Sequence, residues 1–320
     1  MFLCVSANPA IDKRITLPTL VPGGIHRAQT VRSFPGGKST HVAMVLKALG
    51  AQPHWIGMCG GATGEQVVAG LRSLGIAPHS VPIGGQTRTN LEIVDDTSGV
   101  TEIREPGDPV SSEEFAAFER QCKKLFEKQG ESTLVIFSGS LPPGGPDDLY
   151  ARLITSARHS GCHTLLDSSG EALRVALSAR PDFVKPNREE AVALVNFAID
   201  SNHAAAEAVQ QLIALGARSV ALSLGSSGMV YAARENAQML FAPAVSLRPR
   251  STVGCGDAAV AGLAHSFCSG LAPAEAIRKA TACAAANCIA DSPGAVRAEL
   301  VREFEAQVRV EILLAHGPAE

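Results

Sequence analysis

The chain has 320 residues, 46% of them hydrophobic, which is ample for the core of one large or two small domains. Its 28 basic and 31 acidic residues are interspersed and leave a net charge of -3, so we expect small-molecule partners and neither a nucleic acid nor a membrane. No apolar run reaches about 18 residues and no basic segment precedes the first strand, which predicts a cytoplasmic protein.

Two hairpins are predicted in the first third of the chain. The turn signal Pro22-Gly23-Gly24 separates two extended segments. Residues 87–94 alternate polar and apolar side chains, and residues 100–104 follow across a turn at 95–99. Alternation leaves one face of a strand in water, so these segments predict a small antiparallel sheet apart from the main one.

A glycine-rich segment, Pro35 to Thr40, follows the first hairpin and opens a helix that runs to about Leu49. The segment is similar to a P-loop, but the Walker pattern requires a glycine where this chain has Arg32, which excludes that motif. The loop can still bring backbone N–H groups and Lys38 close to a polar ligand at a helix start.

From about Ser111 onward, helices alternate with continuous apolar strands, which predicts a mostly parallel sheet with helices on both faces. The strands are residues 134–137, 164–166, 183–184 and 220–223. Ligands bind beyond the carboxyl ends of such strands. Those ends carry the polar segments 138–140, 167–169, 185–187 and 223–225. Their convergence predicts a ligand site at this edge, in one domain with a small lid.

The segment Ser251 to Gly262 predicts an anion site. Gly254, Gly256 and Asp257 precede a run of small residues typical of a buried helix. The first N–H groups of a helix lack partners and carry partial positive charge, so a phosphate can bind there. Asp257 would lie beside it and could take a proton from an attacking hydroxyl. The alternative is an ordinary turn with Asp257 as the helix cap.

Eight motifs carry a resemblance to a known family. They are Asn8-Pro9-Ala10-Ile11-Asp12, Pro35-Gly36-Gly37-Lys38, Thr87-Arg88, Ser138-Gly139-Ser140-Leu141-Pro142, Asp167-Ser168-Ser169, Lys185-Pro186-Asn187, Val220 to Gly225, and Ser251 to Asp257. In this order they resemble the ribokinase-like sugar kinases of the phosphofructokinase B family, within the branch of 6-phosphofructokinase, 1-phosphofructokinase and tagatose-6-phosphate kinase. The resemblance implies one kinase domain over residues 1–320. Its fold would be an α/β three-layer sandwich with a lid β-sheet from about 12–34 and 87–105.

The resemblance also implies an ATP- and Mg²⁺-dependent kinase. Asp257 would be the catalytic base, and the backbone of Gly254, Cys255 and Gly256 the anion hole, with cysteine where alanine is usual. The nucleotide would contact Lys185, Asn187, Ser223, Gly225 and Gly228. Glu190 would hold Mg²⁺ through a bound water, the alternative being a solvated helical glutamate. A monovalent cation such as K⁺ near Ser251 and Val253, as in some relatives, stays open.

On the sugar side, the resemblance implies contacts from Asp12, Gly36, Gly37, Lys38, His41 and Ser140. Arg88 would grip the phosphate already on the sugar, because a guanidinium fork suits that task. Arg27 would reach the neighbouring site across a homodimer formed through the lid sheet. The alternative for both arginines is a solvated surface charge.

The chain departs from the family pattern at two positions. His41 replaces an asparagine that touches sugar hydroxyls, and Ser39 replaces a glycine. We expect the change at His41 to concern the sugar and to leave the chemistry at Asp257 untouched.

The expected reaction is phosphorylation of a ketohexose monophosphate, with fructose 6-phosphate preferred, to a bisphosphate. Fructose 1-phosphate, tagatose 6-phosphate and an unphosphorylated sugar or nucleoside remain alternatives, and Arg88 argues against the last. A non-catalytic sugar-phosphate sensor is the alternative of another class.

Overall fold

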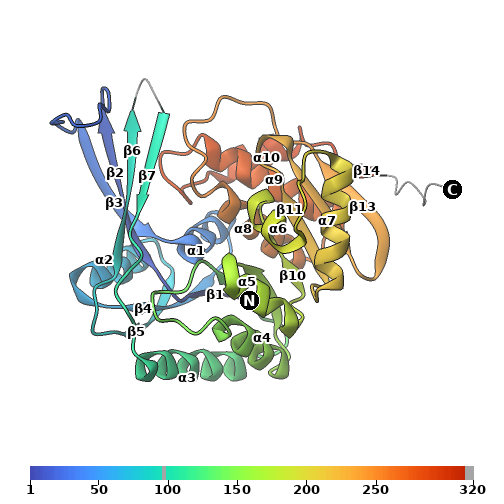
Figure 1. Ribbon diagram of the computed structural model, residues 1–320, viewed down its shortest axis with the longest axis horizontal. Coiled ribbons are helices and arrows are strands. Elements are labelled where there is room, and N and C mark those ends of the chain that lie inside the picture. The colour runs from blue at the N-terminus through green and yellow to red at the C-terminus, as the bar shows by residue number, and fades with distance from the viewer. Residues whose placement is uncertain (96–98, 314–320) are drawn as a thin grey trace.

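The computed structural model describes residues 1–95 and 99–313, which form a ten-stranded sheet and a separate four-stranded sheet (Figure 1). In sheet order, the ten strands are β14 (Glu311–Leu313), β13 (Asn236–Ala242), β12 (Met229–Ala233), β11 (Ser219–Ser223), β10 (Phe183–Val184), β9 (His163–Asp167), β8 (Leu134–Ser138), β1 (Phe2–Ser6), β4 (Pro53–Cys59) and β5 (Ala77–Pro82). The strands from β11 to β5 are parallel, and β12, β13 and β14 add to them in antiparallel fashion.

The four strands predicted from about Ser111 onward are confirmed as β8, β9, β10 and β11. Their continuous apolar runs are buried because helices cover both faces of the sheet. Strands β12 to β14, which were not predicted from the sequence, widen the same sheet. The expectation of an α/β fold with a mostly parallel central sheet is confirmed.

Helices form one layer on each face of the large sheet. The first layer contains α3 (Ser112–Gln129), α4 (Leu149–His159), α5 (Gly170–Ala176), α6 (Arg188–Val195) and α7 (Asn202–Ala214). The second contains α1 (Lys38–Ala48), α2 (Gly61–Ser73), α8 (Cys255–Cys268), α9 (Pro273–Cys288) and α10 (Ala298–Glu305). Successive residues of β1 serve the two layers in turn: Leu3 and Val5 pack on the first side, and Phe2 and Cys4 on the second.

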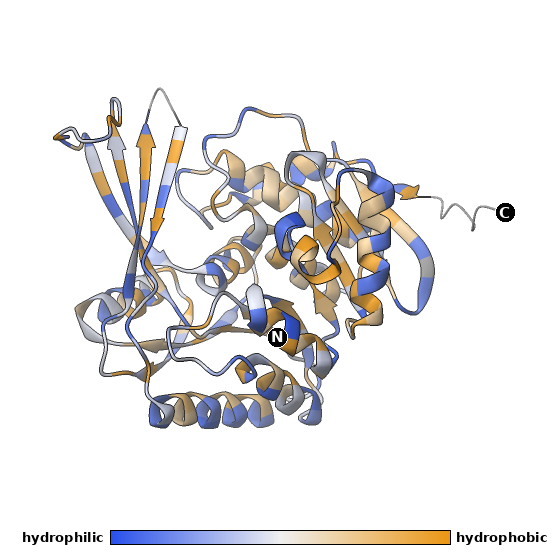
Figure 2. Ribbon diagram, in the orientation of Figure 1, coloured by the Kyte–Doolittle hydropathy of each residue, from blue (hydrophilic) through white to orange (hydrophobic). Residues whose placement is uncertain are grey.

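The four-stranded sheet, called the lid sheet below, stands apart from the body of the molecule (Figure 1). Its order is β3 (Thr30–Gly36), β2 (Ala10–Leu17), β6 (Arg88–Asp95) and β7 (Gly99–Arg104). Figure 2 shows hydrophilic and hydrophobic residues mixed along these strands. Both predicted hairpins are confirmed by the antiparallel pairs β2–β3 and β6–β7, although residues 96–98 of the second turn lie outside the described part.

The prediction of a wholly antiparallel lid sheet is wrong, because β2 and β6 pair in parallel, with Ala10 opposite Arg88. The reason lies in the large sheet. β2 follows β1 and β6 follows β5, and β1 and β5 run in the same direction, so the chain enters the lid sheet twice with the same polarity. Among the described residues, none of the helices combines the length and apolar character needed to cross a membrane.

Candidate active site

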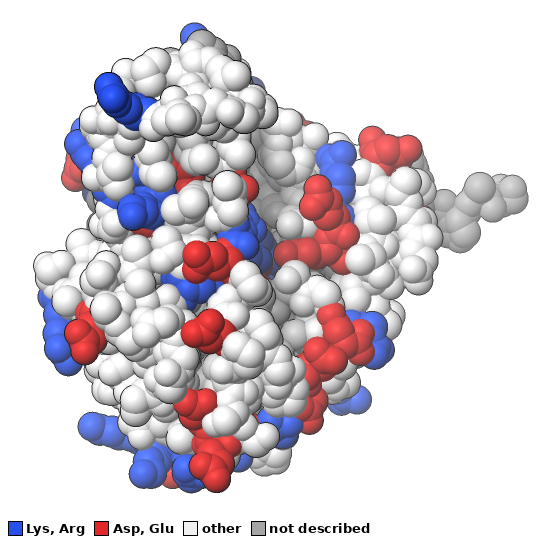
Figure 3. Space-filling view, turned by 60° about the vertical axis from the view of Figure 1, so that its left-hand side comes forward, with Lys and Arg blue, Asp and Glu red and all other residues white. Residues whose placement is uncertain are grey.

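A cleft of about 1050 Å³ lies between the lid sheet and the carboxyl edge of the large sheet. Asp12 and Arg88 line it from the lid sheet, and Lys185 and Asp257 line it from the body. Figure 3 shows the surface hollowed between these two parts, with basic side chains inside the hollow. The polar segments at the strand ends therefore converge on one cleft, as predicted.

The start of α8 forms one end of this cleft. Gly254 is the N-cap residue of α8 with φ 78°, and a Cβ there would lie 2.9 Å from a side-chain atom of Pro293, so glycine is required for two reasons. Ala258 N donates to Gly254 O at 2.9 Å. The preceding amides of Gly256 and Asp257 are those that a helix start leaves available to an anion.

Asp257 belongs to the first turn of α8 and does not cap it, which contradicts the alternative of a capping aspartate. Its side chain is largely buried and lines the cleft. A carboxylate at this place lies within one helical turn of the amides that an anion would contact. The arrangement suits a base that acts beside a phosphoryl group.

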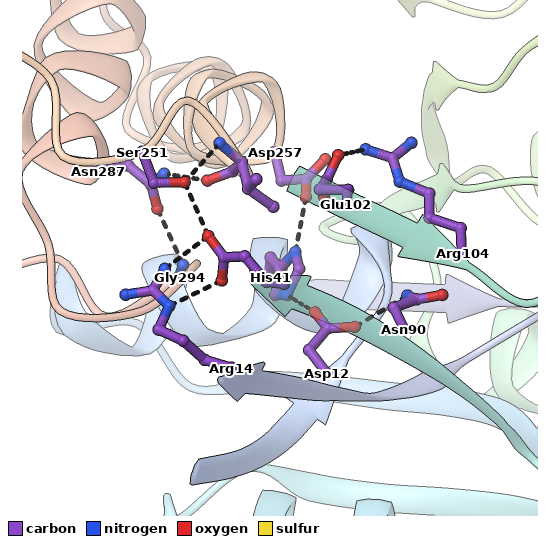
Figure 4. Close-up of polar contacts among 12 residues, drawn as sticks. Asp12, Arg14, His41, Asn90, Glu102, Arg104, Ser251, Asp257, Asn287 and Gly294 are labelled. Carbon is purple, nitrogen blue, oxygen red and sulfur yellow. Dashed lines mark hydrogen bonds and ion pairs between the residues drawn. The ribbon is translucent and has the colours of Figure 1, made fainter. Parts of the chain in front are cut away.

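His41 joins Asp257 to Asp12, as Figure 4 shows. Nδ1 of His41 lies 2.8 Å from Asp257 Oδ2, and Nε2 lies 2.8 Å from Asp12 Oδ2. Burial opposes the charged ring, but the hydrogen bonds to both carboxylates raise the pKa of His41 to about 10. The expectation that His41 concerns only the sugar side is wrong, because its ring contacts Asp257 directly. The sequence did not indicate this contact, since the two residues are 216 positions apart.

Asp12 is held from two directions. Asn90 Nδ2 donates to Asp12 Oδ1 at 2.8 Å, and His41 engages the other oxygen. Burial works against ionisation, yet these donors hold the pKa of Asp12 below its usual range. A Cβ on Gly36 would lie 2.2 Å from the carboxyl carbon of Asp12, so the first glycine of the loop makes room for this carboxylate. The sequence analysis missed Asn90.

Asp167 organises the strand ends. Its carboxylate lies 3.4 Å from Lys38 Nζ and 3.3 Å from Lys185 Nζ, and it accepts a hydrogen bond from Ser138 Oγ at 3.1 Å. Burial opposes its charge, but the two ammonium groups lower the pKa of Asp167. Asp167 is at the end of a predicted strand, but the sequence alone assigned it no role. Its position after an apolar strand was the available signal.

Asn187 and Glu190 form the start of α6. Asn187 Oδ1 accepts from Glu190 N, and Glu190 Oε2 accepts from Asn187 N, both at 2.8 Å. Glu190 Oε1 also faces Lys38 Nζ at 3.5 Å, and its side chain is only 11% exposed, so the solvated alternative is wrong. Both carboxylate oxygens of Glu190 already interact with other residues of the protein. Glu190 is therefore better suited to bind a magnesium ion through a water molecule than to coordinate it directly.

The remaining residues predicted for the nucleotide lie on the same side of the cleft. Ser223 forms an isolated bridge with Asn187, and Leu224 N donates to Gly228 O at 2.8 Å. Gly225 and Gly228 therefore bound a tight loop after β11. The cleft-lining residues of this group are Lys185, Asn187, Ser223, Gly225 and Gly228.

Arg88 lines the cleft from the lid sheet. Its Nη1 and Nη2 donate to the carbonyls of Glu105 and Asn8, each at 3.0 Å, and its buried Nε has no hydrogen-bond partner among the described residues. Arg104 of β7, which the sequence analysis missed, also lines the cleft and pairs with Glu102. The charge of Arg104 is balanced by Glu102, whereas Arg88 has no salt bridge among the described residues and leaves a positive charge suited to a phosphate at this end of the cleft.

The loop residues Gly37 and Lys38, together with Ser140, line the cleft as predicted, whereas Gly36 lies behind Asp12. Arg27 is exposed and is not among the cleft-lining residues of this single chain. Its predicted role requires a second chain and stays a prediction.

A largely buried link ties the lid sheet to the body, and its central residue, Glu92, also lines the cleft. Arg14 Nε and Nη2 donate to the two carboxylate oxygens of Glu92 at 2.8 Å each, and Ser251 Oγ donates to Glu92 Oε1 at 2.8 Å. Val253 N donates to Ser251 Oγ at 3.2 Å. The hydroxyl of Ser251 is thus engaged in this link, and the cation predicted near Ser251 and Val253 stays a prediction.

Comparisons with known proteins identify relatives over most of the chain. The profile described as "pfkB family carbohydrate kinase" matches residues 6–296. The chain is 37% identical over 267 residues to 1-phosphofructokinase of Xanthomonas campestris pv. campestris, covering 82% of each chain. It is 35% identical over 279 residues to 1-phosphofructokinase of Rhodobacter capsulatus, covering 87% of each. Phosphofructokinase-2 from Escherichia coli, solved in complex with potassium, has a TM-score of 0.88 at 28% identity and covers 96% of this chain and 98% of that chain.

Proposed function

Since the chain belongs to the pfkB family of carbohydrate kinases, we propose that it transfers the γ-phosphoryl group of ATP to a fructose monophosphate and forms fructose 1,6-bisphosphate. The family expected from the eight motifs is confirmed. The observation that carries the proposal is the cleft itself. Asp257 and the amides of the α8 start lie at the body side, and Arg88 lies on the lid side.

Asp257 is the proposed base. It would accept the proton of the sugar hydroxyl as the oxygen attacks the γ-phosphorus in line, and ADP leaves. The N–H groups of Gly256 and Asp257 would stabilise the charge that develops on the phosphoryl oxygens, and Lys185 would add a positive charge from the strand end. Glu190 would hold a magnesium ion through a bound water, and the ion would supply further neutralisation of the phosphate charge.

Arg88 and Asp12 would select the substrate. The guanidinium of Arg88 has no salt bridge among the described residues, so its charge remains for a phosphate on the sugar. Asp12 would accept hydrogen bonds from ring hydroxyls, and Asn90 and His41 keep it ionised and oriented.

Fructose 1-phosphate is the substrate that the named relatives favour. The two at 35% identity or more are 1-phosphofructokinases, whereas the likeness to phosphofructokinase-2 is at 28%. Fructose 6-phosphate, preferred on the sequence alone, is the second candidate. A fructofuranose ring carries one CH₂O arm on each side of its ring oxygen, so one cleft can hold a phosphate on either arm and present the other to Asp257.

The deciding experiment is a substrate panel read by ADP release, with fructose 1-phosphate, fructose 6-phosphate, tagatose 6-phosphate and fructose. We expect fructose 1-phosphate to give the highest kcat/KM and fructose the lowest. The reverse order of the two fructose phosphates would leave the reaction type intact and change the substrate. No ADP release with any sugar would contradict the kinase and favour a sugar-phosphate sensor.

We also propose that the lid sheet pairs with that of a second chain. Val31 and Ile103, on strands of this sheet, are 52% and 51% exposed, and Ile25, beyond the end of β2, is fully exposed. A second chain would cover such an apolar face and could bring its Arg27 toward this cleft. Sedimentation of Ile103→Lys against the unchanged protein tests this, because a dimer through the lid sheet should become monomeric.

A further inference from the structure

His41 lies between two carboxylates that come from different elements and face each other across its ring (Figure 4). Asp12 is on β2 and Asp257 on α8, and His41 is 5% exposed. An ionised carboxylate can only accept a hydrogen bond. Both ring nitrogens must therefore donate, which makes the ring an imidazolium with one N–H for each carboxylate.

The charges around the ring support this form. From α1 itself, Lys38 acts on Asp257 through its positive charge, and from β6 Arg88 acts on Asp12. Asn90, also on β6, donates to Asp12 and carries no charge. The two carboxylates that contact His41 outweigh its burial and keep the ring charged well above neutral pH, since its pKa is raised to about 10.

We propose that His41 is a positioning residue for Asp257. Its two N–H groups join Asp12, which would bind the sugar hydroxyls, to Asp257, which would accept the proton of the attacking hydroxyl. The inference rests on the proposed function of Asp257 as the base. The hydrogen bond from Nδ1 engages Asp257 Oδ2 and fixes the rotation of the carboxylate, so Oδ1 is left to accept the proton of the sugar. The cation between Asp12 and Asp257 also offsets the repulsion of two buried negative charges.

The asparagine of the family pattern cannot make the same link. Its amide donates from a single nitrogen, whereas the imidazolium donates from two nitrogens on different sides of a rigid ring. His41→Asn thus replaces a cation that donates to both carboxylates with a neutral amide, so neither Asp12 nor Asp257 keeps a hydrogen bond to a charged donor.

The test compares His41→Asn with Asn90→Ala. His41→Asn should lower kcat by about tenfold or more, because Asp257 loses its hydrogen bond to a cation. Asn90→Ala should act mainly on KM for the sugar phosphate, because Asn90 contacts Asp12 and not Asp257. If His41→Asn loses its cooperative unfolding transition, His41→Gln takes its place in the same comparison.

The pH profile separates positioning from a merely structural role. In the unchanged protein, kcat should fall as pH rises through about 10, because the imidazolium then loses one N–H. His41→Asn should lack this alkaline decline, and Asn90→Ala should keep it. A kcat of His41→Asn within about twofold of the unchanged protein, or the same alkaline decline in that variant, would overturn the inference.

A spectroscopic measurement on the sugar-free protein is independent of the proposed reaction. NMR of isotope-labelled histidine should find both nitrogens of His41 protonated at about pH 8, since the pKa is raised to about 10. A single protonated nitrogen would refute the link even if the kinase activity is present. Conversely, absent kinase activity with a doubly protonated ring would refute the reaction and leave the link between Asp12 and Asp257 standing.

Discussion

The two walls of the cleft are built in different ways. On the body wall, Lys38 and Lys185 both lie against Asp167, and Lys38 also faces Glu190. On the lid wall, Arg88 donates only to backbone carbonyls in the described part of the chain. Charges on the body wall are therefore balanced by the protein, whereas the charge of Arg88 is left for a ligand.

This difference assigns different tasks to the walls. Groups on the body wall come from strand ends and helix starts of a sheet buried on both faces, so their positions are fixed before any ligand binds. The lid sheet is a separate sheet, tied to the body by the link of Arg14, Glu92 and Ser251. We expect changes on the body wall to lower kcat, and changes on the lid wall to raise KM.

The largest effect is expected on the body wall, at Asp257→Asn. An amide cannot accept the proton, so kcat should fall on the order of a thousandfold, which is about 4 kcal/mol in the barrier. ATP affinity, measured by calorimetry, should change little, because the amides of the α8 start remain. Full activity of this variant would contradict the role of Asp257, and equal losses of kcat and ATP affinity would indicate a disturbed helix start.

Glu92→Gln tests the link between the walls. The substitution removes the carboxylate charge to which two nitrogens of Arg14 donate. It leaves this partly buried guanidinium without its carboxylate partner, at a cost of about 3 kcal/mol. Urea unfolding should show this loss of stability. Glu102→Gln is the matched control, because Glu102 pairs with the more exposed Arg104 and should cost under about 1 kcal/mol. Equal losses in the two variants would mean that the link does not hold the lid sheet to the body.

Arg88→Ala tests the lid wall directly. Removal of one charge-assisted pair with a phosphate should cost about 2 kcal/mol, which raises KM for the sugar phosphate roughly thirtyfold and leaves kcat nearly constant. Arg32→Ala is the control, because Arg32 lies on the same sheet, is exposed and is not a cleft-lining residue. A loss confined to kcat, or an equal effect of the two variants, would remove the distinction between the walls.

The body wall could be predicted from sequence because its signals are local. A continuous apolar run followed by a polar residue, as at Asp167 or Lys185, places a side chain at the carboxyl edge of a parallel sheet. The glycines around Asp257 mark a helix start in the same way. Each of these features needs only a few neighbouring residues to be recognised.

The contacts between the walls could not be predicted in this way. His41 and Asp257 are 216 positions apart, and Glu92 and Ser251 are 159 apart. The substitution at His41 was visible, but its consequence depended on a carboxylate that only the fold brings to the other side of the ring. The parallel pairing of β2 and β6 was missed for the same reason, since it is set by the directions of β1 and β5.

The smallest effect is expected at Cys255→Ala, again on the body wall. Cys255 is the first residue of α8 and its backbone N–H donates to Thr252 O at 3.3 Å. Its thiol lies 3.1 Å from that of Cys288 and 3.4 Å from Asn287 Nδ2. Asn287 keeps its stronger hydrogen bond to Val253 O at 2.7 Å without the thiol. The variant should lose under about 1 kcal/mol of stability and less than about twofold in kcat. A larger fall in kcat would show that the side chain of Cys255, and not only the backbone, shapes the start of α8. The body wall would then depend on side chains in the same way as the lid wall depends on Arg88.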